Sequence, residues 1–375
     1  FRSRRRSLNF NGPHAYFFVP TKRKASLTKP LTLSIDAMGG DNAPEMVLEG
    51  IEVALGKLSR VKFLLFGDEQ RLAPLLKLHP RAALASEIRH TDEAITNEQK
   101  VSSALRAGRR SSMRLAIDSV GSGEAAGVIS AGNTGALMAM AKFVLKTLPG
   151  IDRPAIAGYF PTERGKSVML DLGANVDCNA DNLVQFAVMG EVFARNVLGI
   201  ENPSIGILNV GAENLKGNEA VKTASNMLTE TTLPIKFHGF IEGDDIGAGA
   251  VDVVVTDGFT GNIALKTAEG TAKMFGNHLK QAFSESIISK IGAWLARSSL
   301  KKFKLQVDPR LYNGAMFLGL NGVCIKSHGG TDALGFSNAI YVAVEMITHS
   351  FNEGIKEDYA QLSGHTLEMN DVAKN

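Results

Sequence analysis

The chain has 375 residues, of which 44% are hydrophobic and 21% are charged, a balance typical of folded globular proteins. The first 30 residues hold eight Lys and Arg and no acid, so the formal net charge of +3 hides a remainder with 33 basic and 38 acidic residues. The acidic remainder gives no reason to expect a nucleic-acid partner. Two cysteines and the lack of an 18-residue apolar run argue against a disulfide framework and a membrane-spanning helix.

Three regions are predicted from the composition. Residues 1–30 form a basic extension that resembles a transit peptide only in being Arg-rich and free of acids, and we expect it to be disordered. Residues 31–356 form one α/β domain, and residues 357–375 form a polar tail. The scarcity of cysteine is typical of a reducing compartment, so we expect a cytoplasmic protein.

From residue 31 onward, short apolar runs alternate with amphipathic stretches. The apolar runs, each closed by Gly, Asp, Asn or Ser, predict strands at 31–37, 61–68, 125–132, 166–175, 204–211, 235–243 and 251–259. The stretches between them predict helices, for example at 44–58, 100–120, 134–147, 179–198 and 213–229. This alternation predicts a three-layer α/β/α sandwich with a mostly parallel sheet.

Polar residues follow the predicted strands where these end. In an open parallel sheet, ligands bind beyond the carboxyl ends of the strands. The first such loop holds Asp36, Gly39, Gly40 and Asp41, and its glycines let backbone N–H groups approach a ligand. The loop is equally compatible with an ordinary strand–helix turn.

The segment SAGNTGALMA at 130–139 is a sharper candidate for an anion site. Ser130, Asn133, Thr134 and Gly135 directly precede an apolar helix, so backbone amides, short polar side chains and the helix dipole can surround a phosphate. The alternative is that Thr134 simply caps the helix.

Polar loops also follow the next predicted strands, in DLGAN (171–175) and NVGAENLKG (209–217). Lys216 follows a turn and could hold phosphate or polarise a thioester carbonyl. A lone lysine after a turn is nevertheless more often a solvated side chain.

The helix predicted at 179–198 has capping candidates in Asn179 and Asp181. Phe186, Met189 and Val192 or Phe193 recur at helical spacing, and we interpret this stripe as core.

Two further loops carry potential chemistry. TDGFTGNIALK (256–266) offers Asp257, Thr260, Asn262 and Lys266 after a strand. IKSHGGTDALGF (325–336) offers Lys326 and His328 beside two glycines, and the choice between a catalytic and a structural histidine stays open.

Residues 265–304 depart from the α/β alternation and predict two helices that form an amphipathic hairpin. Its apolar side includes Ile287, Ile291, Trp294 and Leu295, and its fringe is basic. Such a segment can bind a membrane surface or pack against a partner or the core, and both readings stay open.

The chain lacks the sequence motifs of several enzyme classes. There is no Walker motif, H-E-x-x-H, cysteine pair or GxSxG elbow, and VGSGEAAG (120–127) precedes a strand instead of following one. We therefore expect no metal and no cofactor. The remaining groups suit a direct displacement that requires orientation and oxyanion stabilisation.

Taken in order, DAMGGD, SAGNTGALMA, DLGANVDC, NVG-x-E-x-x-KG, VVTDGFTGN-x-x-LK and IKSHGG resemble the bacterial phosphate acyltransferase family, over residues 31 to about 353. The resemblance implies transfer of a fatty acyl group from acyl-[acyl carrier protein] to inorganic phosphate. It also implies a phosphotransacetylase-like or isocitrate-dehydrogenase-like fold, a homodimer, and peripheral contact with the membrane through the hairpin. A membrane glycerol-3-phosphate acyltransferase would then use the product.

The same resemblance implies roles for individual residues. Lys216 and Asn262 are the best catalytic candidates, with His328 beside them. The residues expected to line the cleft or bind phosphate are Asp36, Gly39, Gly40, Asp41, Ser130, Asn133, Thr134, Gly135, Asp171, Asn175, Asn209, Glu213, Asp257, Thr260, Lys266 and Lys326. The chain departs from the family pattern at Ala212 and, mildly, at Gly330 and Thr331.

Three alternatives share some of these features. A coenzyme A-dependent phosphotransacetylase or an NAD-dependent decarboxylating dehydrogenase would have the same sheet architecture. A non-catalytic membrane-binding scaffold would account for the basic amphipathic hairpin.

Overall fold

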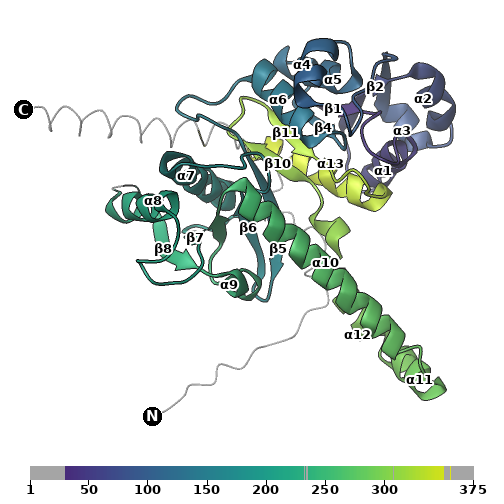
Figure 1. Ribbon diagram of the computed structural model, residues 1–375. Helices are drawn as coiled ribbons and strands as arrows, with labels where there is room; N and C mark the ends of the chain where they lie inside the picture. Colours follow the sequence, from purple (N-terminus) through teal and green to yellow (C-terminus); the bar gives the residue numbers. More distant parts are fainter. Residues whose placement is uncertain (1–29, 232, 234, 307, 350–354, 356–375) are drawn as a thin grey trace, which may run out of the picture.

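The computed structural model describes residues 30–231, 233, 235–306, 308–349 and 355 (Figure 1). The predicted extension, apart from Pro30, and the predicted tail at 357–375 lie outside the described residues. Within the described part, eleven strands form one sheet in the order β3-β2-β1-β4-β11-β10-β5-β6-β9-β7-β8.

The sheet consists of two parallel groups of strands that run in opposite directions. The first group is β1 (Leu31–Asp36), β2 (Val61–Gly67), β3 (Ser86–His90), β4 (Gly127–Ser130) and β11 (Val323–Lys326). The second group is β6 (Gly165–Leu170), β7 (Ser204–Leu208), β8 (Lys236–Ile241) and β9 (Val253–Val255). Between them lie β10 (Ala315–Leu318) and β5 (Ala155–Thr162), whose pairings with β11, with each other and with β6 are antiparallel.

Side chains that alternate along the strands feed two separate cores, one on each face of the sheet. Along β2, Phe63 and Leu65 join one hydrophobic cluster, whereas Leu64 and Phe66 join the other. The layers expected of an α/β/α sandwich are therefore present, and the mostly parallel sheet is confirmed, because seven of its ten strand pairings are parallel.

Helices cover both faces. Those that contribute to the first cluster are α1 (Glu45–Leu55), α2 (Glu69–Leu76), α3 (Pro80–Ala85), α7 (Ala180–Asn196), α8 (Glu219–Glu230) and α13 (Ala333–Thr348). Those that contribute to the second cluster are α4 (Val101–Ala107), α5 (Ser112–Gly121), α6 (Thr134–Leu145) and α9 (Gly243–Ala248). A 3-10 helix, η1 (Pro309–Tyr312), precedes β10.

All seven predicted strands form, but four others were missed, namely β3, β5, β10 and β11. The helix predicted at 100–120 is two helices. Gly108 ends α4, and the Ser111 hydroxyl caps α5 by accepting the Arg114 N–H at 3.3 Å. The helix predicted from residue 213 begins only at Glu219, because Asn218 caps it and residues 213–217 form a turn.

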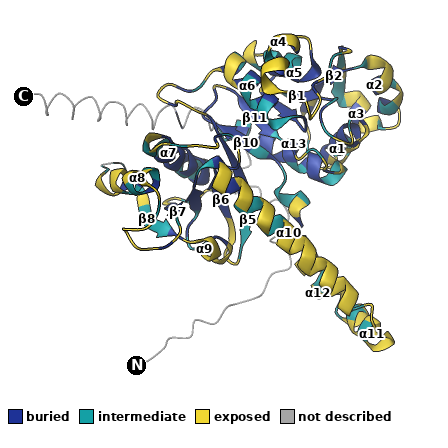
Figure 2. Cartoon of the chain, viewed as in Figure 1, coloured by how far each residue is buried: buried dark blue, intermediate teal, exposed yellow. Residues whose placement is uncertain are grey.

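The prediction for α7 is confirmed in its cap and its core. Asn179 accepts the Asn182 N–H at 2.9 Å, and the Asn182 side chain accepts the Asn179 N–H in return. Phe186, Met189 and Phe193 are fully buried (Figure 2).

The predicted two-helix hairpin at 265–304 is wrong in its bounds and in its number of helices. The first helix, α10 (Gly258–Ala282), begins at the Asp257 cap, and two shorter helices follow, α11 (Ile287–Leu295) and α12 (Arg297–Gln306). Together they project from the body of the molecule, with α11 at the far end (Figure 1).

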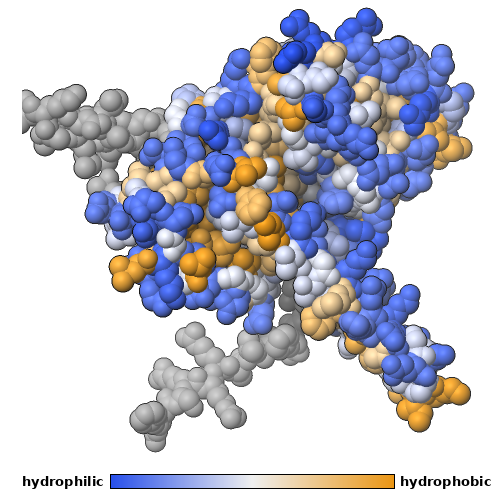
Figure 3. Space-filling model, in the orientation of Figure 1, coloured by the Kyte–Doolittle hydropathy of each residue, from blue (hydrophilic) through white to orange (hydrophobic). Residues whose placement is uncertain are grey.

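The hairpin leaves its apolar side chains in solvent. Ile287, Ile291, Trp294 and Leu295 are 54–77% exposed, and the tip forms an apolar patch in Figure 3. The core-packing interpretation of this stripe is therefore excluded within the described chain. None of the described helices is both long enough and apolar enough to cross a membrane.

Candidate active site

The first group of predicted site residues meets where β1, β4 and β11 end side by side. The carboxylate of Asp36, at the end of β1, is buried and accepts hydrogen bonds from the hydroxyls of Ser112 and Ser130, each at 2.6 Å. Burial raises the pKa of Asp36, and the two hydroxyls and the more distant Lys326 oppose that shift. Ser130 also accepts the Gly132 N–H at 3.0 Å, so its hydroxyl fixes both loops.

The glycine loop after β1 is packed too closely for side chains. A Cβ on Gly39 would lie 2.8 Å from the backbone nitrogen of Gly132, and Gly40 has φ +112°, which favours glycine. Asp41 donates its N–H to the Gly329 carbonyl at 2.9 Å, and its carboxylate accepts a hydrogen bond from Asn97 at 2.7 Å. The loops after β1 and β11 are thereby joined.

Lys326 places an ammonium group at the centre of these loops. Its Nζ donates to the carbonyl oxygens of Ala131 (3.2 Å) and Ser327. Burial lowers its pKa to about 8, although Asp36 and Asp41 favour the charged form.

His328 lies two residues further on at the same edge. The Asn313 side chain accepts the backbone N–H of His328 at 2.9 Å, and the ring Nδ1 accepts the Gly330 N–H at 3.1 Å. In the neutral ring the proton is therefore on Nε2. Burial lowers the pKa of His328, and the nearby Lys266 adds to this effect.

The helix α6 begins one residue earlier than in the alternative that has Thr134 as its cap. Asn133, not Thr134, is the N-cap, and its side chain accepts the Ala136 N–H at 3.0 Å. The same amide donates to the carbonyl oxygens of Asn97 (2.9 Å) and Gln99 (3.1 Å), so it also ties down a neighbouring loop. Thr134 and Gly135 form the first turn, whose N–H groups are not used by the helix itself.

A second group of site residues gathers where β6 and β9 end. The buried Asp171 carboxylate accepts hydrogen bonds from the backbone N–H groups of Ile156, Gly173, Ala174 and Asn175, at 2.6–3.2 Å, and from the Asn175 amide at 2.9 Å. Burial raises the pKa of Asp171 against these donors. Because both of its carboxylate oxygens accept these hydrogen bonds, Asp171 stabilises the conformation of the 172–177 loop.

The helix α10 starts against this loop. Asp257 caps it by accepting the N–H and the hydroxyl of Thr260, at 2.8 and 2.9 Å. Asn262, the fifth residue of α10, is exposed, and a Cβ on Gly173 would lie 3.7 Å from the Asn262 Cβ. One turn later, Lys266 pairs with Glu269 at 2.7 Å. Because Lys266 also influences the pKa values of Lys326 and His328, α10 connects the second group with the first.

The third group lies in the turn after β7. Lys216 is exposed and pairs with Glu213 at 3.0 Å, which lowers the pKa of that carboxyl. The Asn209 amide donates to the carbonyl oxygens of Gly211 (3.0 Å) and Lys216 (3.1 Å) and so closes the turn.

The three groups do not share one edge of the sheet, as a uniformly parallel sheet would have required. The carboxyl ends of β1, β4 and β11 open on one edge, and those of β6, β9 and β7 open on the other, because the second group of strands runs in the opposite direction. Sequence reasoning missed Ser112, Asn97 and Asn313, which hold Asp36, Asp41 and His328. The first two lie in no recognisable motif, and the local sequence signal at Asn313 is the Asn-Gly pair that it forms with Gly314, which is typical of a turn.

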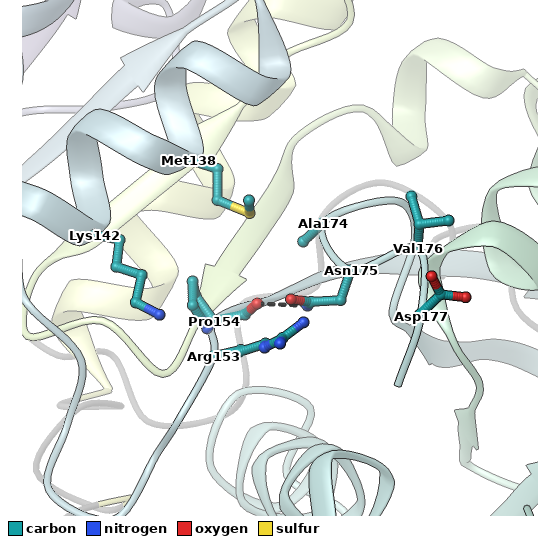
Figure 4. A pocket seen from close by; sticks show the side chains of 8 residues that line it. All are labelled: Met138, Lys142, Arg153, Pro154, Ala174, Asn175, Val176 and Asp177. Carbon is teal, nitrogen blue, oxygen red and sulfur yellow. Dashed lines mark hydrogen bonds between the residues drawn. The ribbon is translucent and has the colours of Figure 1, made fainter. Parts of the chain in front are cut away.

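A cavity of about 400 Å³ lies between α6 and the 172–177 loop (Figure 4). Met138 and Lys142 line it from α6, and Arg153 lines it from the segment before β5. Asn175 donates its amide to the Pro154 carbonyl at 2.9 Å on the opposite wall. Asp177 also lines the cavity, which thus combines basic, acidic and apolar side chains and borders the loop that faces Asn262.

Among the described residues, no group of three or more His, Cys, Asp or Glu side chains is placed to hold a metal ion.

Solved structures of similar architecture define the class of fold. A phosphotransacetylase from Streptococcus pyogenes matches with a TM-score of 0.59 at 17% identity, covering 88% of this chain and 97% of that one. A branched-chain phosphotransacylase from Enterococcus faecalis matches with a TM-score of 0.54 at 13% identity, covering 84% and 99%. At these identities the likeness shows a shared α/β sandwich.

Comparison with protein families is more specific. The family model described as fatty acid synthesis protein matches residues 31–354. Relatives named phosphate acyltransferase include one from Paramagnetospirillum magneticum, 60% identical over 336 residues (90% of this chain, 96% of the relative). Another, from Rhodospirillum centenum, is 59% identical (90% and 95%). The chain belongs to the phosphate acyltransferase family and is an acyltransferase, as its ordered motifs predicted.

Proposed function

We propose that the chain transfers a long-chain fatty acyl group from acyl-[acyl carrier protein] to inorganic phosphate, giving an acyl phosphate for phospholipid synthesis. The observation that carries this proposal is the 60% identity to a relative whose name gives both the acyl transfer and the phosphate acceptor. The family description, fatty acid synthesis, supports a fatty acyl group over an acetyl group.

The reaction is a direct displacement. A phosphate oxygen attacks the thioester carbonyl carbon, a C–O bond forms, and the C–S bond breaks. The proton released from phosphate ends on the thiol of the carrier. The protein's task is to hold phosphate against the carbonyl and to stabilise the oxyanion that develops during attack.

Phosphate is proposed to bind among the loops after β1, β4 and β11. The Lys326 ammonium, the Nε2–H of His328 and the free N–H groups at the start of α6 are cationic or hydrogen-bond donors suited to a phosphate dianion. Lys266 on α10 adds positive charge nearby. Asp36, Ser130 and Asn133 would act as positioning residues, since their polar atoms already hold these loops.

Lys216 and Asn262 are proposed as the groups that stabilise the oxyanion. Both side chains are exposed, and Gly173 leaves room beside the Asn262 amide. Asn262 lies one helical turn before Lys266, which influences the pKa values of Lys326 and His328, so α10 connects Asn262 with the proposed phosphate loops. Lys216 lies in a different turn, and its proposed part in the reaction requires the turn after β7 to approach the same carbonyl. Asp171 and Asp257 would position Asn262 by shaping the loop and the helix start.

The hairpin is proposed to bind the membrane surface peripherally, since its apolar side chains are exposed and flanked by lysines and an arginine. This would place an apolar acyl phosphate near a membrane glycerol-3-phosphate acyltransferase that consumes it. We also propose a homodimer, to be checked by light scattering.

Donor choice is the decisive test. The purified chain is supplied with phosphate and, separately, with palmitoyl-[acyl carrier protein], palmitoyl-coenzyme A and acetyl-coenzyme A, and acyl phosphate is measured. We expect the highest kcat/KM with the carrier-bound donor. Preference for acetyl-coenzyme A would identify a phosphotransacetylase activity and overturn the proposal.

A further inference from the structure

A cationic surface lies beside the cavity of Figure 4. Residues 100–146, which include α4, α5 and α6, contain seven Lys and Arg and two acids, a net charge of +5, whereas residues 31–375 as a whole carry 33 basic and 38 acidic residues. We name its centre the α4–α6 basic face, made of Arg109, Arg110, Arg114, Lys142, Phe143 and Lys146.

An exposed aromatic ring forms the middle of this face. Phe143, on α6, is 59% exposed, with the Arg114 guanidinium 5.2 Å and the Lys146 ammonium 4.8 Å from its ring centroid. Arg114 also pairs with Asp118 at 2.8 Å and its side chain is only 16% exposed, so Lys146 is the more accessible of the two cations. An accessible aromatic side chain among cations is a combination enriched at protein interfaces.

Two more arginines lie in the turn between α4 and α5, and α4 packs on α6. A Cβ on Gly108, at the end of α4, would lie 3.2 Å from the Met140 Cε, one helical turn before Phe143. Arg109 and Arg110 follow directly and are exposed, and the Arg110 Nε lies 3.9 Å from the Glu93 carboxylate. Because this ion pair is long and exposed, Glu93 neutralises the charge of Arg110 only weakly.

The face continues into the cavity. Lys142 belongs to both, since it lines the cavity together with Met138 and Arg153 (Figure 4). Across the cavity, the 172–177 loop leads to Gly173 and the exposed Asn262. The cavity therefore lies between this face and the loop beside Asn262.

We propose that the α4–α6 basic face is the docking surface for the acyl carrier protein, an inference that rests on the proposed function. Acyl carrier proteins are strongly acidic, so the face offers complementary charge and an apolar contact. Within the described part of the chain the hairpin is another basic segment, but its tip projects away from the body of the molecule (Figure 1) and its exposed apolar side chains suit a membrane surface.

The test reverses charge at two exposed positions on the face. We expect the double variant Arg110→Glu, Lys146→Glu to raise KM for palmitoyl-[acyl carrier protein] at least tenfold, with kcat within about twofold. Kinetics with palmitoyl-pantetheine, which lacks the protein, should change less than about twofold. The hairpin variant Lys301→Glu, Lys302→Glu makes the same charge change elsewhere and should leave both KM values unaltered.

Three results would overturn the docking surface. The first is an unchanged KM for palmitoyl-[acyl carrier protein] in the variant Arg110→Glu, Lys146→Glu. The second is an equal rise of that KM in the hairpin variant. The third is an altered oligomeric mass in Phe143→Ser, which would assign the face to contact between two copies of the chain. Failure of the proposed function is distinct, because the wild-type protein itself would then make no acyl phosphate from the carrier-bound donor.

Discussion

At the scale of single residues, two lysines that each pair with a glutamate offer a matched test of catalysis. Lys216 and Lys222 each pair with a glutamate three residues away, at 3.0 and 3.1 Å. If Lys216 stabilises the oxyanion, Lys216→Ala should lower kcat by about 100-fold or more, the loss typical of removing one such group. Lys222→Ala removes an equivalent ion pair and should change kcat less than twofold. Equal effects would remove Lys216 from the mechanism.

The pKa of Lys326 gives phosphate binding a pH dependence. Because burial lowers that pKa to about 8, the ammonium is lost as pH rises through this value, well below the ordinary lysine range. We expect KM for phosphate to rise about tenfold by roughly pH 9. Lys326→Arg keeps its charge throughout this range and should show a flatter profile.

Ionisation of phosphate itself affects the wild type and Lys326→Arg equally. The difference between their pH profiles of KM therefore reflects the ionisation of Lys326. Thermal unfolding of the arginine variant at each pH confirms that the larger side chain is accommodated. Parallel KM profiles in two folded proteins would show that Lys326 does not bind phosphate.

At the scale of elements, close packing of α10 on the backbone at Asp171 distinguishes two glycines of one helix. A Cβ on Gly261 would collide with the Asp171 carbonyl oxygen, whereas a Cβ on Gly270 would meet nothing. Gly261→Ala should destabilise the fold by about 1–3 kcal/mol and impair activity. Gly270→Ala should be neutral or stabilising by up to about 1 kcal/mol. Urea unfolding compares the two, and equal stabilities would contradict this packing.

The exposed apolar side chains of the hairpin lead to a second prediction at the scale of elements. Ile291 and Trp294 are 54% and 62% exposed, so Ile291→Asp, Trp294→Asp should leave the midpoint of thermal unfolding unchanged. The same change should lower sedimentation with phosphatidylglycerol vesicles at least tenfold, because apolar insertion is lost.

Leu78 and Leu84 are 71% and 91% exposed, and Leu84 lies on α3, outside the hairpin. Leu78→Asp, Leu84→Asp therefore controls for removal of surface apolar groups and should keep vesicle binding. If the hairpin variant sediments with vesicles as the wild type does, the apolar tip does not bind the membrane, and contact between protein chains becomes the remaining role for it.

The sequence patterns predicted which segments form strands better than they predicted the directions in which those strands run. Runs such as LTLSIDA and VDVVVTDGF identified buried strands because both faces of the sheet are covered. By contrast, β5 contains Gly158 and Pro161, and β3 is short and partly charged, so neither has a strand-like pattern.

The missed strand β5 had a large consequence. Its antiparallel pairing with β6 and β10 reverses half of the sheet, and the predicted site residues are consequently divided between two edges. Local polar patterns such as DAMGGD could be recognised without this knowledge, but contacts such as Ser112 to Asp36 depend on how distant segments pack.

At the scale of the whole molecule, charge is distributed unevenly. Residues 100–146 have a net charge of +5 within a chain whose part after the basic extension has more acids than bases. An acidic carrier would therefore be attracted locally and repelled elsewhere, an arrangement that favours one orientation on encounter.

Salt should weaken this orientation, because the Debye length is only about 8 Å at 0.15 M. Raising KCl from about 0.05 to 0.3 M should lower kcat/KM for palmitoyl-[acyl carrier protein] roughly tenfold, compared with less than about twofold for palmitoyl-pantetheine. Screening of phosphate at Lys326 is common to both donors, so it cancels in their ratio. In Arg110→Glu, Lys146→Glu the salt dependence of that ratio should disappear. A ratio equally salt-dependent in this variant and in the wild type would mean that long-range attraction of the carrier arises elsewhere on the molecule, with the basic hairpin as the next surface to reverse.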